Sequence, residues 1–139
     1  MITCVVHYTV DPTKIEFFES FSKAWIYLVE KHGGEHHGYF LPSEGANDQA
    51  IALFSFESFA AYERYRGLFG KDEEFIRADR IRDASGCILR YDRTFMRPLL
   101  PRDVNGPPEA LRPEPQRTEA STYAPPAVNG NHGDEGAGS

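Results

Sequence analysis

The sequence predicts an α+β, ferredoxin-like βαββαβ fold, in which a four-stranded antiparallel sheet carries helices on one face. One observation is the order of the expected elements (strand, helix, strand, strand, helix, strand), which is the split βαβ pattern. Another is that all ten Phe and six of the seven Tyr precede Met96, whereas eight of the ten Pro lie from Pro98 onward. We therefore expect one folded domain, residues 1–98, and a Pro/Gly-rich disordered C-terminal tail, residues 99–139.

The first strand is expected from Ile2 to Val10, and the first helix follows it directly. In the strand, both alternating sets of residues are largely apolar or β-branched, which is typical of a central strand. Asp11-Pro12 then supplies a helix cap and a residue suited to the first helical position. From Ile15, apolar residues recur at helical spacing until Gly33-Gly34 ends the helix.

Two strands in a hairpin are expected next, over residues 35–41 and 50–56. The segment between them, residues 42–48, contains Gly45, Asn47 and Asp48, which favour a turn with a longer loop. The hairpin supplies the second and third strands of the sheet.

The second helix begins at Ser58, which suits a helix cap, and Gly70 interrupts it. Asp72 caps a continuation that runs to Gly86. The last strand covers residues 87–97, and its charged residues favour an edge position in the sheet: Arg90, Asp92 and Arg93.

The connections between these elements leave one face of the sheet bare. Two right-handed crossovers place both helices on the same face of the sheet. An uncovered apolar sheet face needs a partner to shield it from water. We therefore expect a homodimer.

Composition and charge exclude several classes of function. The 15 Lys and Arg against 21 Asp and Glu give a formal net charge of -6, so the chain is a poor match for nucleic acid or an anionic membrane. Cys4 and Cys87 are too few and too far apart for a disulfide framework or a zinc module. The sequence has no obvious secretory leader and no apolar run of membrane-spanning length. These features favour a soluble, cytoplasmic protein.

Three segments carry a resemblance to a known family. Residues 35–45 read EHHGYFLPSEG, residues 52–56 read ALFSF, and residues 60–66 read AAYERYR. In this order the segments resemble the NIPSNAP family, and the resemblance extends roughly from Met1 to Pro98. It implies the dimeric α+β barrel superfamily, in which two sheets pack face to face.

Candidate site residues gather on the predicted strands. Neighbouring His36 and His37 leave opposite faces of a strand, so they cannot chelate one metal ion together. We predict no metal and no cofactor. If Tyr39 shares the face of His37, both side chains reach one bound ligand, and these two are the predicted catalytic pair. Four further residues are the predicted ligand-binding set: His7, His36, Ser55 and Arg90.

The function remains open among three alternatives. The first is a homodimeric domain that binds a small molecule and has no assigned activity. The second, which the superfamily resemblance implies, is a cofactor-independent monooxygenase or isomerase acting on a small aromatic or polyketide-like substrate. The third is a non-catalytic interaction module. Whether the chain is an enzyme is not decided by its sequence.

Overall fold

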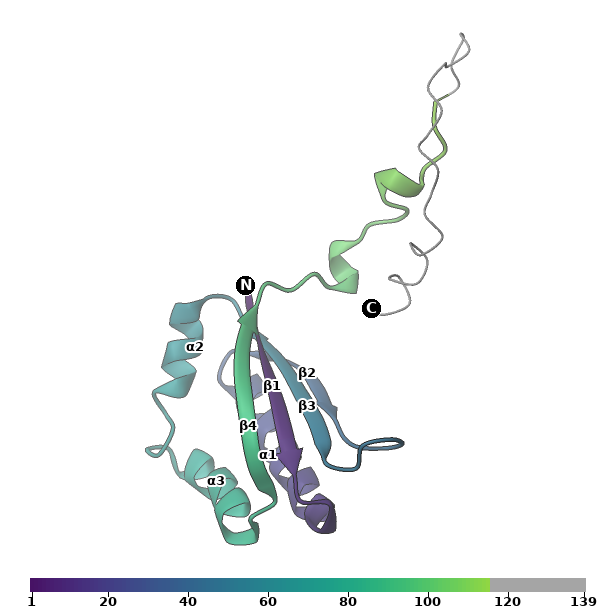
Figure 1. The fold of residues 1–139 in the computed structure, drawn as a ribbon. Coiled ribbons are helices and arrows are strands. Elements are labelled where there is room, and N and C mark those ends of the chain that lie inside the picture. The colour runs from purple at the N-terminus through teal and green to yellow at the C-terminus, as the bar shows by residue number, and fades with distance from the viewer. Residues whose placement is uncertain (116–139) are drawn as a thin grey trace. The chain divides into compact units, whose positions relative to one another are not determined.

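A computed structural model of the chain describes residues 1–115, and its elements follow the predicted order (Figure 1). The four strands form one sheet in the order β2-β3-β1-β4, with every neighbouring pair antiparallel. The ferredoxin-like prediction is thereby confirmed, with β1 central and β4 at an edge. The elements are β1 Ile2–Val10, α1 Ile15–Lys31, β2 Glu35–Phe40, β3 Gln49–Phe56, α2 Phe59–Arg66, α3 Glu73–Ser85 and β4 Ile88–Met96.

The chain divides into two compact units, Met1–Leu100 and Pro101–Ser139. The first holds the sheet and all three α-helices, and the described part of the second holds two short 3-10 turns, Pro101–Asp103 and Glu109–Leu111. The disordered tail expected over residues 99–139 stays a prediction, and residues 116–139 of it lie outside the described part.

Local sequence explains where α1 begins and ends. A 3-10 turn, Pro12–Lys14, leads into the helix, and Asp11 Oδ1 accepts hydrogen bonds from Thr13 N at 3.0 Å and Thr13 Oγ1 at 2.7 Å. The helix stops where Gly33 adopts a φ of +93°, which other residues rarely tolerate. At Gly34 a Cβ would lie only 2.6 Å from Val29 Cγ1, so only glycine lets the chain turn this closely against the helix.

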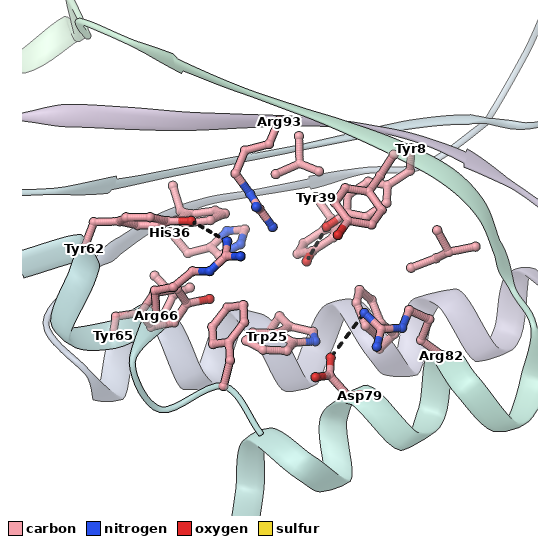
Figure 2. Close-up of a pocket in the computed structure, with 17 residues that line it drawn as sticks. Tyr8, Trp25, His36, Tyr39, Tyr62, Tyr65, Arg66, Asp79, Arg82 and Arg93 are labelled. Atoms are coloured by element: carbon pink, nitrogen blue, oxygen red, sulfur yellow. Dashed lines mark hydrogen bonds and ion pairs between the residues drawn. The ribbon is translucent and has the colours of Figure 1, made fainter. Parts of the chain in front are cut away.

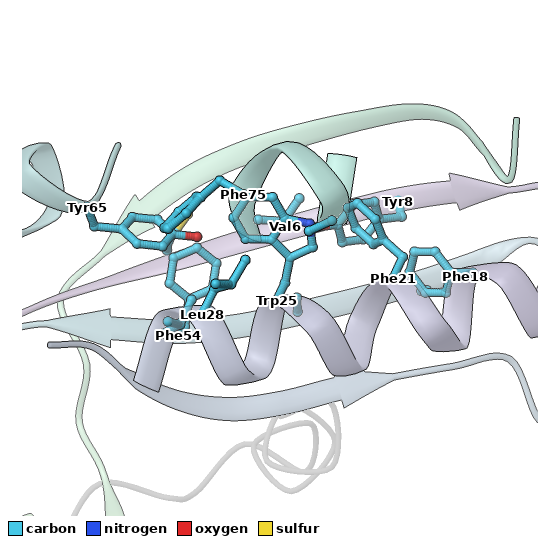
Figure 3. Close-up of a cluster of buried hydrophobic side chains, with 14 of the residues drawn as sticks. Val6, Tyr8, Phe18, Phe21, Trp25, Leu28, Phe54, Tyr65 and Phe75 are labelled. Carbon is cyan, nitrogen blue, oxygen red and sulfur yellow. The ribbon is translucent and has the colours of Figure 1, made fainter. Parts of the chain in front are cut away.

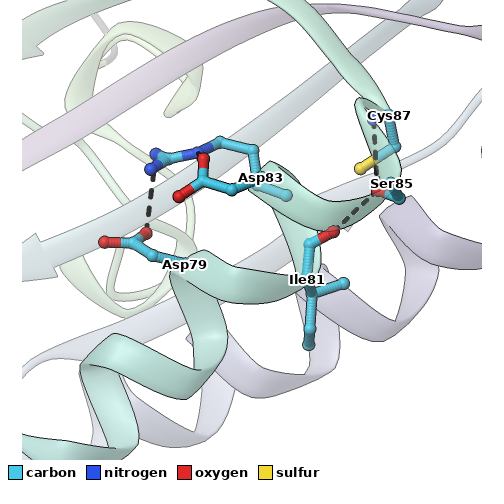
Figure 4. Close-up of polar contacts among 6 residues, drawn as sticks. Asp79, Ile81, Asp83, Ser85 and Cys87 are labelled. Atoms are coloured by element: carbon cyan, nitrogen blue, oxygen red, sulfur yellow. Dashed lines mark hydrogen bonds and ion pairs between the residues drawn. The ribbon is translucent and has the colours of Figure 1, made fainter.

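The predicted second helix is divided in two, as Gly70 indicated. Ser58 caps α2 by accepting from Ala61 N at 3.1 Å, and Asp72 caps α3 by accepting from Glu74 N at 2.9 Å. At the end of α3, Ser85 Oγ donates to the Ile81 carbonyl at 2.6 Å and accepts from Cys87 N at 3.2 Å (Figure 4). These contacts define where α2 begins and where α3 begins and ends.

A β-bulge in β2 decides which side chains face the helices. His36 pairs with Phe54 of β3, whereas Gly38 pairs with the next residue, Leu53, so His37 is an extra residue in the strand. Gly38 accommodates the bulge with a φ of +109°. Strict alternation is broken, and His36 and Tyr39 therefore lie on the same face of the sheet.

The hydrophobic core lies between the sheet and the helices (Figure 3). Its largest fully buried side chains include Phe18 and Leu28 of α1, Phe56 of β3 and Phe75 of α3. Within the unit Met1–Leu100, no helix covers the strands on the opposite face of the sheet. Several apolar side chains are exposed there or beside it, among them Phe40 at 54%, Leu89 at 62% and Met96 at 55% of their surface.

Candidate functional site

A cavity of about 110 Å³ lies between the sheet and the helices (Figure 2). The sheet forms its roof, and all three α-helices contribute side chains to its floor and sides. Its lining combines many aromatic rings with a small number of charged groups. The polar and aromatic members of the lining that matter below are Tyr8, Trp25, His36, Tyr39, Tyr62, Arg66, Asp79, Arg82, Tyr91 and Arg93.

Stacked rings form the wall of the cavity beside β2. The His36 and Tyr39 rings lie almost parallel, with centroids 5.1 Å apart and an interplanar angle of 14°. Tyr39 stacks in turn on Tyr8 at 5.9 Å, and the two hydroxyl oxygens are 3.4 Å apart. This wall offers flat apolar surfaces with hydrogen-bonding groups at their edges, which suits a planar ligand.

The charges in the lining are mainly positive. Arg82 pairs with Asp79, with Nη1 and Oδ1 3.5 Å apart (Figure 2), and with Asp83 outside the lining, with Nε and Oδ1 2.9 Å apart. Arg66 Nη1 donates to Tyr62 Oη at 3.4 Å, and the Arg66 guanidinium carbon lies 5.2 Å from the centroid of the Phe69 ring. Three guanidinium groups thus face the cavity with one carboxylate.

Arg93, like Arg66, has no carboxylate partner among the described residues. It extends from β4 toward the helices, and its guanidinium lies 5.5 Å from the centroid of the Tyr91 ring. Its Nε is fully buried and has no hydrogen-bond partner within the described residues. A buried donor left unsatisfied costs roughly 1–3 kcal/mol, so a ligand that supplies an acceptor recovers that cost.

Burial sets the protonation states of the ring system. It lowers the pKa of His36 to about 4, with a smaller contribution from nearby His37, so the imidazole is neutral at pH 7. His36 Nδ1 accepts from Gly38 N at 2.9 Å, which places the single ring proton on Nε2. Burial also raises the pKa of Tyr8 to about 12 and that of Tyr39 well above its usual value. Both tyrosines therefore keep their protons and act as hydrogen-bond donors.

Of the six predicted site residues, the structure brings only His36 and Tyr39 into the cavity. The sequence-based expectation that His37 and Tyr39 share a face is wrong, because the bulge places His37 on the open face. There His37 Nε2 lies 2.7 Å from Ser55 Oγ, which lies 2.6 Å from Thr3 Oγ1.

The other two predicted residues also lie away from the cavity. His7 pairs with Asp92 across the β1–β4 ladder and is exposed on the open face. Arg90 is exposed, and its Nη2 donates to Asp92 Oδ2 at 3.3 Å. Neither contributes to the cavity lining, so the ligand-binding set predicted from sequence is not one cluster.

Sequence reasoning overlooked three cavity residues, Trp25, Arg66 and Arg93. The helical spacing of Trp25 is typical of a core residue, and Trp25 does pack in the core, yet its indole nitrogen is a buried donor without a partner within the described residues. Alternation along the last strand was the available signal for Arg93. It sits two residues from both Tyr91 and Phe95, and all three face the helices in register with β1.

Residues 1–115 contain no group of three or more His, Cys, Asp or Glu side chains placed to hold a metal ion. In the same part of the chain, no helix has the length and apolar character needed to cross a membrane. Both cysteines, Cys4 and Cys87, are buried free thiols.

The family model for NIPSNAP proteins matches residues 5–100 of the chain. This chain belongs to the NIPSNAP family. The matched segment contains all four strands of the NIPSNAP domain for most of their length, all three α-helices and the whole cavity lining. A comparison with curated proteins gave no match.

Solved structures with the same fold include other NIPSNAP proteins. A NIPSNAP family protein with unknown function from Agrobacterium tumefaciens has a TM-score of 0.60 and 18% identity, covering 70% of this chain and 87% of its own. An uncharacterized NIPSNAP-like domain protein from Burkholderia xenovorans has a TM-score of 0.58 and 19% identity, covering 70% and 84%. A putative antibiotic biosynthesis monooxygenase from Nitrosomonas europaea has a TM-score of 0.57 and 9% identity, covering 72% and 100%. At these identities, the similarities establish the fold.

Proposed function

We propose that this NIPSNAP protein is a homodimeric small-molecule-binding domain whose ligand is a monocyclic aromatic anion held between the sheet and the helices. The observation that carries the proposal is the buried Arg93 Nε, which lacks a hydrogen-bond partner among the described residues and lies among aromatic rings. A carboxylate placed there would receive charge-assisted hydrogen bonds.

The balance of charge favours an anion over a cation or a neutral ligand. Arg82 is shared between Asp79 and Asp83, so the lining cations without a carboxylate partner among the described residues are Arg66 and Arg93. His36 adds a neutral donor through Nε2–H because Nδ1 is occupied by Gly38 N–H. Unpaired donors thus outnumber unpaired acceptors, and an acceptor-rich ligand complements them.

The size of the cavity favours a single ring. Apolar cavities of roughly 150 Å³ accept one benzene molecule. The present cavity, at about 110 Å³, is smaller, so one ring is the upper limit of size, and a substituted ring requires the lining side chains to move outward. Stacking on the wall formed by His36, Tyr39 and Tyr8 would orient the ring.

The geometry supports binding better than proton abstraction. A general base at His36 would need an accessible unprotonated nitrogen, but Nδ1 already accepts a backbone hydrogen bond and Nε2 carries the proton. His37, the predicted acid/base residue, lies on the other face of the sheet. A monooxygenase or isomerase activity stays a second candidate, favoured by the fold shared with the putative monooxygenase and by His36 as a donor that could stabilise an enolate oxygen.

The proposed dimer has separate support. The open face presents the half-buried apolar side chains Ile51 and Leu53 beside polar groups that are already hydrogen-bonded to one another. A second copy packed on this face would shield the apolar surface. We also propose a cytoplasmic location, in keeping with two buried free thiols and the absence of a membrane-spanning helix among residues 1–115.

Benzoate and benzamide are a matched pair of probes, because they differ in charge but hardly in size. Trp25 is the only tryptophan and lines the cavity, so its fluorescence reports occupancy. We expect benzoate to bind with a Kd on the order of 1 mM or tighter, and benzamide roughly 10-fold more weakly.

Arg93→Gln should weaken benzoate binding roughly 10- to 100-fold, which corresponds to a lost charge-assisted hydrogen bond. Arg90→Gln is the control, since Arg90 is exposed and faces away from the cavity. Equal affinity for the two probes, or equal losses in the two variants, would contradict the proposal.

A further inference from the structure

We propose that the ligand carries a hydroxyl group on its ring in addition to the anionic group, and that Trp25 and Asp79 recognise this hydroxyl. The inference rests on the proposed function, because it concerns the same cavity. It narrows the ligand class from aromatic anions to hydroxyarene carboxylates, and it makes Trp25 a specificity-determining residue.

The cavity contains two buried donors without partners among the described residues, and they come from opposite walls. Arg93 Nε belongs to β4 in the sheet, and Trp25 Nε1 belongs to α1 beneath it. Figure 2 shows the Arg93 guanidinium entering from the sheet side, while the indole nitrogen of Trp25 is directed toward the end lined by Asp79 and Arg82. One carboxylate bound at Arg93 leaves the second donor unsatisfied, so a ligand complementary to both walls has a second polar group.

The neighbourhood of Trp25 identifies that second group. An apolar substituent would leave Nε1–H buried without an acceptor. A second carboxylate would meet the Asp79 carboxylate, whose ion-pair partner among the described residues is Arg82 at 3.5 Å. A hydroxyl satisfies both, because its oxygen accepts from Trp25 Nε1–H and its proton is donated to Asp79.

The state of Asp79 agrees with this assignment. Burial raises the pKa of its carboxyl group, and Arg82 offsets this effect only in part. The Arg82–Asp79 contact at 3.5 Å is also long for an ion pair with hydrogen-bond geometry. Asp79 is therefore a partly buried acceptor with capacity for a further donor.

The test compares ligands of equal shape on the full-length protein. Isothermal titration calorimetry would measure the affinities of benzoate, the 3- and 4-hydroxybenzoates, and the 3- and 4-methylbenzoates. In the methylbenzoates a methyl group of similar size replaces the hydroxyl. We expect the better hydroxy isomer to bind roughly 3- to 10-fold more tightly than its methyl counterpart, the range of one net hydrogen bond. Trp25→Phe should abolish that difference between the hydroxy and methyl isomers. Tyr27→Phe, on the exposed side of the same helix, is the control.

A second measurement needs no substitution. Because the chain has one tryptophan, its indole N–H gives a single NMR resonance in the labelled wild-type protein. The preferred hydroxybenzoate should move this resonance downfield relative to its methyl counterpart. Failure of benzoate to bind the wild-type protein would overturn the proposed function itself. Benzoate binding with no gain from either hydroxyl, with a gain that persists in Trp25→Phe, or with identical indole shifts for hydroxyl and methyl would overturn only the present inference.

Discussion

Replacing His36 with glutamine should make folding of the domain less sensitive to mild acid. Burial lowers the pKa of His36 from its usual value of 6.5 to about 4. Between these two values the unfolded chain binds a proton that the folded protein does not bind. The stability contributed by neutral His36 is therefore complete above about pH 6.5, falls as the pH drops, and is lost near pH 4.

The magnitude follows from the two pKa values. Between pH 7 and pH 5 a shift of this size lowers the free energy of unfolding by about 2 kcal/mol if it is taken in full. His36 is only part-buried, and we expect screening by solvent to reduce the loss to about 1 kcal/mol. Glutamine does not titrate, so His36→Gln should lack this share of the loss.

Urea unfolding followed by Trp25 fluorescence measures the effect, with the protein concentration held fixed because a dimer would couple stability to concentration. Asp79 changes the stability in the opposite direction. Its raised pKa means that the folded protein binds a proton before the unfolded chain does as the pH falls. The difference between the variant and the wild type is thus the informative quantity. Tyr27→Phe, at an exposed residue on the helical side, is the control and should keep the wild-type loss. An equal loss in His36→Gln and the wild type would refute the reasoning.

Two further predictions concern the dimer and the turn after α1. Leu53→Glu places a charge in the middle of the open face, and in sedimentation experiments it should convert a particle of twice 15.7 kDa into one of 15.7 kDa. The control Tyr27→Glu, on the helical side, should leave the dimer intact. A wild-type protein that is already a single chain at micromolar concentration would disprove the dimer. Gly34→Ala should lower the free energy of unfolding by roughly 1–3 kcal/mol, because its Cβ would lie 2.6 Å from Val29 and 2.8 Å from Phe56, and unchanged stability would show that the turn relaxes freely.

The fold could be predicted because its signals are local. Each signal specifies the extent, beginning or end of one element: the apolar spacing along α1, the caps at Ser58 and Asp72, and the glycines at helix ends. These signals agree with one another. The order of these elements then leaves little choice of topology. The bare sheet face is a direct consequence of that topology.

The candidate site was harder to predict from the sequence, because one extra residue in a strand moves the side chains that follow it to the opposite face of the sheet. Regular alternation places Tyr39 with His37, and the bulge reverses this pairing. A glycine inside a predicted strand, Gly38, was the one signal for a bulge. The position of the extra residue in the register with β3 decides which β2 side chains face the helices. This register is set by tertiary packing.

The two faces of the sheet differ in how their polar groups are satisfied, and this difference separates their roles. On the open face, His37, Ser55 and Thr3 hydrogen-bond to one another, so a second subunit could cover them without leaving any of the three unpaired. On the helical face, the indole nitrogen of Trp25 and Nε of Arg93 are already buried and lack partners among the described residues. A surface whose polar groups are satisfied is suited to a protein interface, whereas unsatisfied donors inside a cavity call for a ligand that supplies the missing acceptors.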